Sequence, residues 1–447
     1  LNEFSAFADA LDAESLEPIR PPEHCLDVLI QHLVTMALQE PWHPDLMFRE
    51  VTSSWAYRDL ARETFNRLLN VLLKGSDSLI KYPEYRRLEQ RSDGCFVLVS
   101  SQIARRHRMG IGTIVSHAHV RVKMRRGASL GEVEESFAGR LKPGDIFRFS
   151  GKRLEMVRLS EGELIVKPAR SGRSGEVPRW TGGRLPLSET LATRVMQDFQ
   201  RQRPLSERIQ NKEWLANALR KTADIQGRIS HCPHQDVTLG ERFKTRDGYH
   251  LCLYPFAGWL VHQALGPLIA TRITERLPAT LTVTVNDYGI EILSPEAEPL
   301  DRCIGFWEAI ISPEKVTVDL ERALNLSELV KGQFRATARI SGLIFEGYPG
   351  RQKSLRMLQT SAGLLYDVLS RYDSTHVLLD QAKYDVLRDE FDIERLETTL
   401  KTLTQRRLTV EAIGQPSPLA LPLVIDRLSA RLSTETVAER MARLTGG

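Results

Sequence analysis

The sequence predicts an α+β fold with more than one domain. At 447 residues the chain is longer than one hydrophobic core usually organises. Three observations indicate the class: helical periodicity and then a hairpin signal in the first hundred residues, regularly spaced short strands between Gly110 and Pro168, and mainly helical patterns after Asp301. We expect a small helical module, then a small antiparallel β-barrel or curled sheet, then a mixed, mostly helical lobe.

Three periodic segments and a hairpin signal define the first module. Apolar residues recur at helical spacing in 24–38 and 60–73, and a proline begins a short helix between them. Extended runs at 85–89 and 95–99 follow, joined through an Asp-Gly turn signal. Helix, helix, helix, hairpin is the order of a winged helix, so we assign residues 22–100 to one.

The third helix of this module has two interpretations. In winged helices that read DNA this helix enters the major groove, which would bring Arg62 and Arg67 to the nucleic acid. The same helix is rich in leucine, which fits a helix that packs inside a larger protein. The sequence alone leaves both alternatives open.

Residues 101–185 are predicted to form a basic, strand-rich segment. Polar and apolar residues alternate over 110–124, so one face of that strand becomes increasingly basic while the other packs. The acidic run at 132–135 is expected to start a short helix. Further strands, each near a turn signal, are expected at 145–149, 154–159 and 164–168.

Positive charge is concentrated in this segment. Residues 101–184 contain 18 Lys and Arg against 8 Asp and Glu, whereas the whole chain has a formal net charge of only +4. The rest of the chain is therefore slightly acidic. Such an asymmetry predicts that a polyanion lies against the basic segment.

Two stretches within the segment have residue types that suit single-stranded nucleic acid. Trp180 stands between Pro-Arg and two glycines, so its ring either plugs the end of the barrel or stacks on a nucleobase with Arg179 and Arg184 on phosphates; we favour stacking. The run at 105–108 is either a solvated basic turn or a nucleic-acid contact at the hinge between two domains, and we favour the contact.

Residues 186–447 are predicted to form a mixed lobe, either alone or as one unit with residues 101–185. A glycine-rich turn at 347–354 opens a helix, so its backbone N–H groups, with Arg351 and Lys353, either hold a phosphate or form a plain helix junction. The expected elements are a helix at 188–200, a strand at 249–254, a long helix to Arg276, a hairpin of 280–285 and 289–293, and helices at 324–345 and 353–371.

Motifs for enzyme chemistry and metal binding are missing. The sequence contains no P-loop, DExH box, nucleophile elbow, H-E-x-x-H or dinucleotide fingerprint, so we predict no catalytic residue and no cofactor site in this chain. Five scattered cysteines form no C-x-x-C pair, and the His231-Cys-Pro-His234 run has no further ligands nearby, so a surface turn is expected there rather than a metal. No apolar run approaches the roughly 20 residues that span a bilayer, so we expect a cytoplasmic protein without a membrane partner.

Seven separated motifs carry a family resemblance. In chain order they begin at Ile103 (IARRHRMGIGTIV), Gly131 (GEVEESF), Arg140 (RLKPGD), Pro178 (PRWTGGRLPLS), Tyr254 (YPFAG), Val285 (VNDYG) and Gly347 (GYPGRQKS). Together they resemble the C-terminal half of Lhr-type, large helicase-related proteins. The sequence is most similar to the ligase-associated DEXH-box helicases of bacterial DNA repair.

The family resemblance implies a domain organisation, an activity and residue roles that the residues alone do not indicate. In that family two N-terminal RecA-like domains hydrolyse ATP with Mg, and a winged helix and a family-specific domain follow. Residues 1–21 would then be a linker from the ATPase half, and the RecA-like domains of the same protein would be partners. The intact protein would move 3′ to 5′ along single-stranded DNA and unwind DNA duplexes or RNA:DNA hybrids. Trp180 would stack on a base of the tracking strand, and Ile111 would lie near the duplex junction.

We therefore expect a nucleic-acid-binding module that is not catalytic alone. Two other classes stay open: a DNA glycosylase-like repair module, to which a weak Gln200-Arg-Gln202 element points, and a winged-helix adaptor. The predicted nucleic-acid-binding residues are Trp180, Ile111, Arg105, Arg106, Arg108, Arg121, Lys123, Arg179, Arg184, Arg351 and Lys353.

Overall fold

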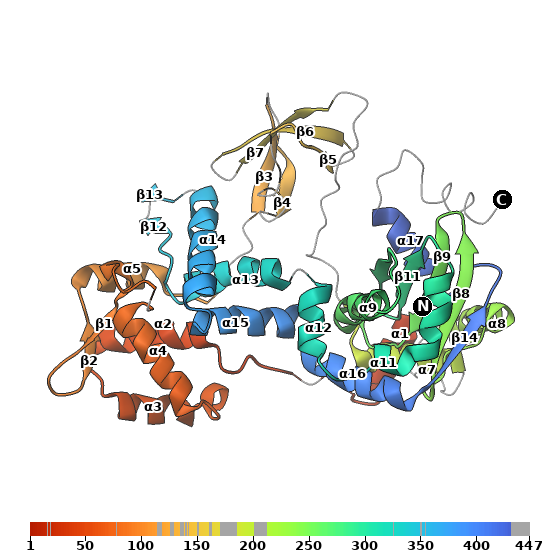
Figure 1. The fold of residues 1–447 in the computed structure, drawn as a ribbon, viewed down its shortest axis with the longest axis horizontal. Coiled ribbons are helices and arrows are strands. Elements are labelled where there is room, and N and C mark those ends of the chain that lie inside the picture. The colour runs from red at the N-terminus through yellow and green to blue at the C-terminus, as the bar shows by residue number, and fades with distance from the viewer. Residues whose placement is uncertain are drawn as a thin grey trace. The chain divides into compact units, whose positions relative to one another are not determined.

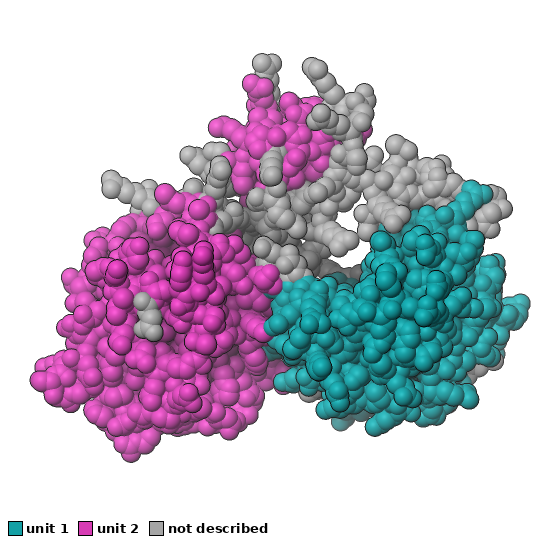
Figure 2. All heavy atoms as spheres, in the orientation of Figure 1, with its two compact units in different colours: residues 1–18, 182–326, 387–447 teal, residues 19–181, 327–386 magenta. Residues whose placement is uncertain are grey.

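The computed structural model describes most of residues 1–430 and divides into two compact units. Unit 1 comprises residues 1–18, 182–326 and 387–447, and unit 2 comprises residues 19–181 and 327–386 (Figure 2). The domain bounds expected from the sequence stay a prediction. The residues outside the described set are 16, 18, 77, 114–118, 126–128, 135–137, 139–140, 142, 150–151, 161–162, 170–185, 201–211, 325, 349–350, 354 and 431–447.

Unit 2 begins with the expected winged helix (Figure 1). Its third helix ends because Gly75 takes φ +82, and a Cβ there would lie 2.7 Å from the Cβ of Tyr85. The hairpin is antiparallel, with Leu88 opposite Leu98. The elements are α2 (Leu26–Gln39), α3 (Pro44–Ser53), η1 (Trp55–Tyr57), α4 (Arg62–Lys74), η2 (Pro83–Tyr85), β1 (Leu88–Gln90) and β2 (Phe96–Leu98).

The basic run at 105–108 lies in a helix, so the alternative of a solvated basic turn is wrong, while the favoured nucleic-acid contact stays a prediction. This helix, α5 (Ser101–Gly110), begins after Ser100, whose side chain accepts the N–H of Ile103. A serine cap and several arginines favour the helix, and the glycines at 110 and 112 end it before the β-branched residues that follow. The arginines of this run therefore project from a helix.

Residues 119–168 contain an open five-stranded sheet. Its order is β4-β3-β7-β6-β5; β3 and β7 run parallel, which the sequence did not predict, and the other pairs are antiparallel. Among the described residues β4 and β5 are the two edge strands and do not pair with each other. Of the two predicted forms, a closed barrel and a curled sheet, the structure therefore has the open sheet. The strands are β3 (His119–Met124), β4 (Ser129–Glu134), β5 (Ile146–Phe149), β6 (Lys152–Ser160) and β7 (Glu163–Pro168).

One face of this sheet is an apolar core. Val120 and Val122 are fully buried in it, whereas Arg121 between them is exposed, so the predicted alternation is confirmed at residues 120–122. The helix expected to start at the acidic run does not begin at residues 132–134, because these belong to β4; Glu135 lies outside the described residues. Val133 pairs with Val120 and is buried beside it, which holds the run in the sheet.

Unit 1 is built around a second five-stranded sheet. Its order is β10-β11-β9-β8-β14, and β14 runs parallel to β8. The hairpin expected around Asn286 is present, and the Asn286 side chain accepts the N–H groups of Tyr288 and Gly289 at 2.9 and 2.8 Å. The strands are β8 (Val237–Thr245), β9 (Gly248–Tyr254), β10 (Thr282–Val285), β11 (Ile290–Ser294) and β14 (Arg407–Ala412).

Helices cover both faces of this second sheet (Figure 1). One face forms a core with α1, α7, α8 and α17, in which Ala6 of α1 is fully buried. On the other face Gly266 lets α9 approach, since a Cβ there would lie 2.7 Å from Cγ1 of Val283. These helices are α1 (Asn2–Asp12), α7 (Glu189–Gln200), α8 (Lys212–Ile229), α9 (Trp259–Thr274) and α17 (Ala420–Ala430).

The remaining elements are mainly helical, as expected after Asp301. None of the helices in the described residues combines the length and apolar character that crossing a membrane requires. The elements are α10 (Glu298–Arg302), η3 (Cys303–Phe306), α11 (Trp307–Ile310), α12 (Val316–Ala323), α13 (Leu326–Ile340), β12 (Gly347–Tyr348), β13 (Arg351–Gln352), α14 (Leu355–Tyr372), α15 (Val377–Asp385), the π-helix η4 (Val386–Glu390) and α16 (Ile393–Gln405).

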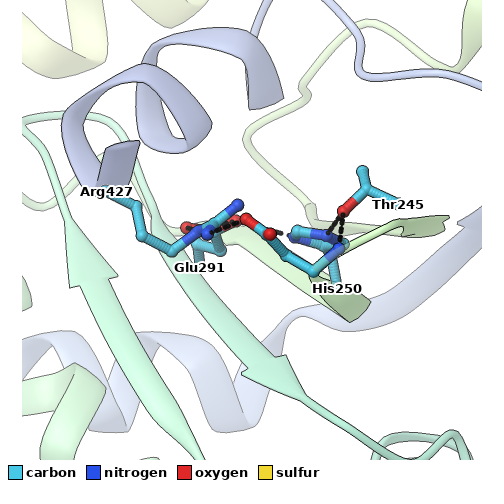
Figure 3. A network of polar contacts seen from close by, with 5 residues as sticks. Thr245, His250, Glu291 and Arg427 are labelled. Atoms are coloured by element: carbon cyan, nitrogen blue, oxygen red, sulfur yellow. Dashed lines mark hydrogen bonds and ion pairs between the residues drawn. The ribbon is translucent and has the colours of Figure 1, made fainter. Parts of the chain in front are cut away.

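A buried polar network fastens α17 to the sheet of unit 1 (Figure 3). Glu291 is fully buried, and its Oε2 accepts a hydrogen bond from Nε of Arg427 at 3.1 Å. Its Oε1 lies 2.7 Å from Nδ1 of His250. Arg427 also donates to Asp247 at 2.6 Å, and Thr245 lies 2.7 Å from Nε2 of His250. The network joins β8 and β9 to β11, 41 positions further along the chain from His250, and to α17, 136 positions beyond Glu291.

Candidate nucleic-acid interface

A groove of about 970 Å³ crosses unit 2. One wall is α5 with the residues that follow it, from Ile103 to Gly112, and the other is the segment 339–348 with β12. Gln31 and Val34 of α2 and Arg87 before β1 also line it, as do Lys353, Ser361 and Leu365. Segments more than 200 residues apart in the sequence thus form one concave surface.

Two arginines of α5 lie over aromatic rings of the opposite wall. The guanidinium carbon of Arg105 is 5.2 Å from the ring centre of Tyr348, and that of Arg106 is 5.6 Å from the ring centre of Phe345. Both separations are within cation–π range. The Nε of Arg106 is buried and makes no hydrogen bond among the described residues.

The second wall is held by its own contacts. Phe345 and Tyr348 meet edge to face with ring centres 5.0 Å apart. The backbone N–H of Lys353 donates to the carbonyl of Glu346 at 2.8 Å, and the Glu346 side chain pairs with Arg339. The glycine-rich turn that the sequence singled out is therefore a short hairpin, β12–β13, and Tyr348 of β12 lines the groove together with Phe345, which precedes the hairpin.

Burial lowers the pKa values of two basic residues at the floor of the groove. Burial lowers the pKa of Arg87 to about 10, which leaves it positive at neutral pH, and it donates to the carbonyl of Ser341. Burial and the nearby Arg87 lower the pKa of His107 to about 4, so this imidazole is neutral at pH 7, and its Nε2 lies 2.8 Å from Oγ1 of Thr35. The groove therefore has a positive character that does not depend on histidine protonation.

The structure places the predicted residues in several locations. Arg106, Ile111 and Lys353 line the groove, and Arg105 lies over Tyr348 at its edge. Arg108 is exposed on α5, and Arg351 belongs to β13. Arg121 is exposed on β3, and Lys123 pairs with Glu163 at 3.5 Å in the same sheet. Trp180, Arg179 and Arg184 lie outside the described residues.

Sequence reasoning missed the aromatic wall of the groove. Phe345 and Tyr348 flank the glycine of the motif at Gly347, but the sequence drew attention to the basic residues that follow. An aromatic pair around a glycine turn, with a distant arginine run, is the signal that could have found them.

The third helix of the winged helix is used for packing. Arg67 of α4 donates to Asp380 of α15 at 2.8 Å and to the carbonyl of Thr375. Arg62 pairs with Asp45 and lies over the ring of Phe48 at 4.9 Å. These contacts favour the packing alternative for α4 over the one in which it reads a major groove.

The His231-Cys-Pro-His234 run is irregular up to His234, which bridges to Val237, and the turn itself is at residues 235–236, just before β8. His231 pairs with Glu411 at 3.0 Å and His234 with Asp236 at 3.3 Å. The described residues contain no group of three or more His, Cys, Asp and Glu side chains that could hold a metal ion.

Comparison with known proteins defines the class. Residues 9–176 match the winged helix domain of the large helicase-related protein, and residues 232–420 match the DEAD/H associated domain. Such a pair of domains is that of a helicase-associated module. The chain belongs to the large helicase-related family, and its two domains are those of the C-terminal half of an Lhr-type helicase.

The sequences of named relatives align with nearly the whole chain. The ATP-dependent helicase Lhr-Core of Methanocaldococcus jannaschii is 26% identical over 97% of this chain and 51% of its own length. The Lhr helicase/uracil glycosylase of Escherichia coli is 24% identical over 98% of this chain but only 29% of its own length. The chain thus spans about half the length of the Lhr-Core relatives.

A solved structure has the same fold. The helicase Lhr of Mycobacterium smegmatis, bound to single-stranded DNA and AMP-PNP, matches 94% of this chain and 50% of its own with a TM-score of 0.63 and 21% identity.

Proposed function

We propose that this chain is the nucleic-acid-binding module of an ATP-dependent helicase that moves 3′ to 5′ along single-stranded DNA. Within DNA repair, in the ligase-associated branch, the whole protein unwinds DNA duplexes or RNA:DNA hybrids. The observation that carries the proposal is the groove of unit 2, in which Arg106 lies over Phe345, with Arg105 over Tyr348 at its edge.

The groove combines the two kinds of group that a single strand needs. Phosphates are attracted by cations, and unpaired bases gain from aromatic and apolar surfaces. Arg106 and Lys353 supply the charge, while Phe345, Tyr348 and the exposed Ile111 supply the surfaces. In this proposal Trp180 adds a stacking ring, and Arg121, Arg179 and Arg184 extend the positive track.

ATP and Mg bind elsewhere in the proposed protein, in RecA-like domains that pair with this module. The Lhr-Core relatives are named ATP-dependent and are about twice as long as this chain. The outward face of α1 supports such a partner, because Phe4, Phe7 and Leu11 are 78%, 53% and 39% exposed while the small residue Ala6 faces the core.

The similarity favours a helicase module over a glycosylase. Two long relatives are named helicase and uracil glycosylase, but this chain covers only 29% of each. It covers about half of relatives that are named helicase alone. A nicking assay on uracil-containing DNA tests the alternative, since a lesion-specific abasic product would overturn the proposal.

Binding of a fluorescein-labelled oligothymidylate, followed by anisotropy, tests the groove. Arg106→Ala removes a charge and a cation–π partner and is expected to weaken binding about tenfold, or about 1.4 kcal/mol. Arg106→Lys keeps the charge, so its affinity for the oligonucleotide is expected to lie between those of the parent chain and of Arg106→Ala. Arg302→Ala, on an exposed helix surface of unit 1, is the control. Equal effects of Arg106→Ala and Arg302→Ala would remove the groove from the proposal.

A further inference from the structure

The backbone after α5 is held in an unusual position at the groove. Ile111 stands between two glycines and is 51% exposed, although branched apolar side chains are usually buried. Gly112 takes φ +151, a conformation that a side chain would strain. Something other than apolar packing must therefore hold this short segment in place.

The side chain of Gln31 holds it. This glutamine lies on α2 and is 8% exposed. Its Nε2 donates to the carbonyl of Gly112 at 3.1 Å, and its Oε1 accepts the N–H of Gly112 at 3.1 Å. The carboxamide therefore pairs with both backbone groups of one residue, as a neighbouring strand would.

The same side chain reaches the second wall. Nε2 also donates to the carbonyl of Ile340 at 2.7 Å, at the last residue of α13. The segment that forms the second wall begins there, and Arg87 supports its next carbonyl, that of Ser341. Gln31 thus uses both of its amide hydrogens and its oxygen to join the end of α5 to the end of α13.

We propose that Gln31 is a positioning residue for single-stranded nucleic acid: it fixes Ile111 at the groove and sets the spacing between the two walls. The inference rests on the proposed function of the groove. Gln31 lies at the floor and acts through Ile111 and through the segment after Ile340.

A probe at position 111 tests the positioning without any ligand. A nitroxide attached to Ile111→Cys reports local motion, with the labelled parent chain as background for the native cysteines. Gln31→Leu keeps the approximate volume but removes all three hydrogen bonds, so the nitroxide is expected to become more mobile. Unchanged mobility would overturn the inference whether or not the chain binds DNA.

A double-mutant cycle tests the functional consequence. Gln31→Leu and Ile111→Ala are each expected to weaken oligothymidylate binding several-fold. Because Gln31 acts partly through Ile111, the two effects are expected to be less than multiplicative in the double variant. Multiplicative effects would mean that Gln31 does not act through Ile111. If the parent chain fails to bind the oligonucleotide, the proposed function fails, and the nitroxide measurement still decides the positioning.

Gln381→Leu is the matched control. Gln381 is also buried and also bonded to α2, since it accepts the N–H of Leu26 at 2.8 Å, but it does not line the groove. This variant is expected to lower the urea midpoint and leave binding unchanged. Equal loss of affinity in both glutamine variants would indicate general loosening of α2 and overturn the inference. If Gln31→Leu does not fold, Gln31→Asn, which is one methylene too short to make all three bonds, replaces it.

Discussion

Arg427→Met is expected to destabilise unit 1 strongly. Glu291 is 0% exposed and Arg427 is 3% exposed, so the charge pair is shielded from water. Methionine fills much of the volume of arginine but leaves the Glu291 carboxylate with His250 as its partner in the network. Removing one member of a buried ion pair typically costs about 3 to 5 kcal/mol, because the other charge stays buried without compensation.

The size of this effect is large against the stability of a domain, which is about 5 to 15 kcal/mol. Urea unfolding followed by circular dichroism measures the loss, and hydrogen exchange of peptides from β9 and β11 locates it. Replacing both charges, in Glu291→Gln with Arg427→Met, is expected to recover part of the stability, since no uncompensated charge is left.

The matched control is Arg302→Met. Arg302 pairs with Glu298 at 2.7 Å, but their side chains are 61% and 65% exposed, so the expected change is below about 1 kcal/mol. A loss below about 1 kcal/mol for Arg427→Met as well would refute the reasoning, because it would show that water or local rearrangement compensates Glu291.

Two further predictions concern pH and stacking. Burial lowers the pKa of His262 to about 4, and this ring accepts the N–H of Ala257 and bonds the carbonyl of Asn286. The pKa of His262 is lower in the folded chain than the value of 6.5 in the unfolded chain, so the unfolded chain takes up a proton first as the pH falls. The contribution of neutral His262 to the stability is therefore complete above pH 6.5 and is lost as the pH falls toward 4, by about 3 kcal/mol in total. Urea unfolding at several pH values should show this decline, and His262→Gln should flatten it; an equal slope in both proteins would contradict the assignment. Trp180→Ala is expected to weaken oligothymidylate binding by about 1 to 3 kcal/mol with an unchanged melting temperature. Unchanged affinity with a lost melting transition would mean that the ring belongs to a core.

The winged helix was predictable because its signals are local. Helical spacing of leucines, the glycine that ends α4 and the Asp-Gly turn each act within a few residues. The helix at 101–110 was missed because its arginines were interpreted as a solvated turn or as a nucleic-acid contact at a hinge, and the signal that starts the helix is the single cap residue Ser100. One cap residue is a weak signal for a helix, and the alternating strand pattern that follows from Gly110 is a stronger one.

The polar networks and the groove depend on residues far apart in the chain. Arg427 and Glu291 are 136 positions apart, and no spacing rule connects them. Arg106 and Lys353 were each predicted to contact nucleic acid, but only the packing of the 339–348 segment opposite α5 brings them into one groove. Propensity and periodicity describe elements one at a time, whereas these sites form when elements pack.

The packing of α4 bears on which kind of recognition the proposed function uses. Reading base edges in a duplex requires a helix that enters the major groove, and in this winged helix Arg67 of that helix is bonded to α15. In the proposed function the groove instead supplies aromatic rings and cations, which suit features that every nucleotide has. A helicase of the proposed kind passes over any sequence and needs contacts of this second kind, so the packing of α4 and the aromatic groove both support the proposed function.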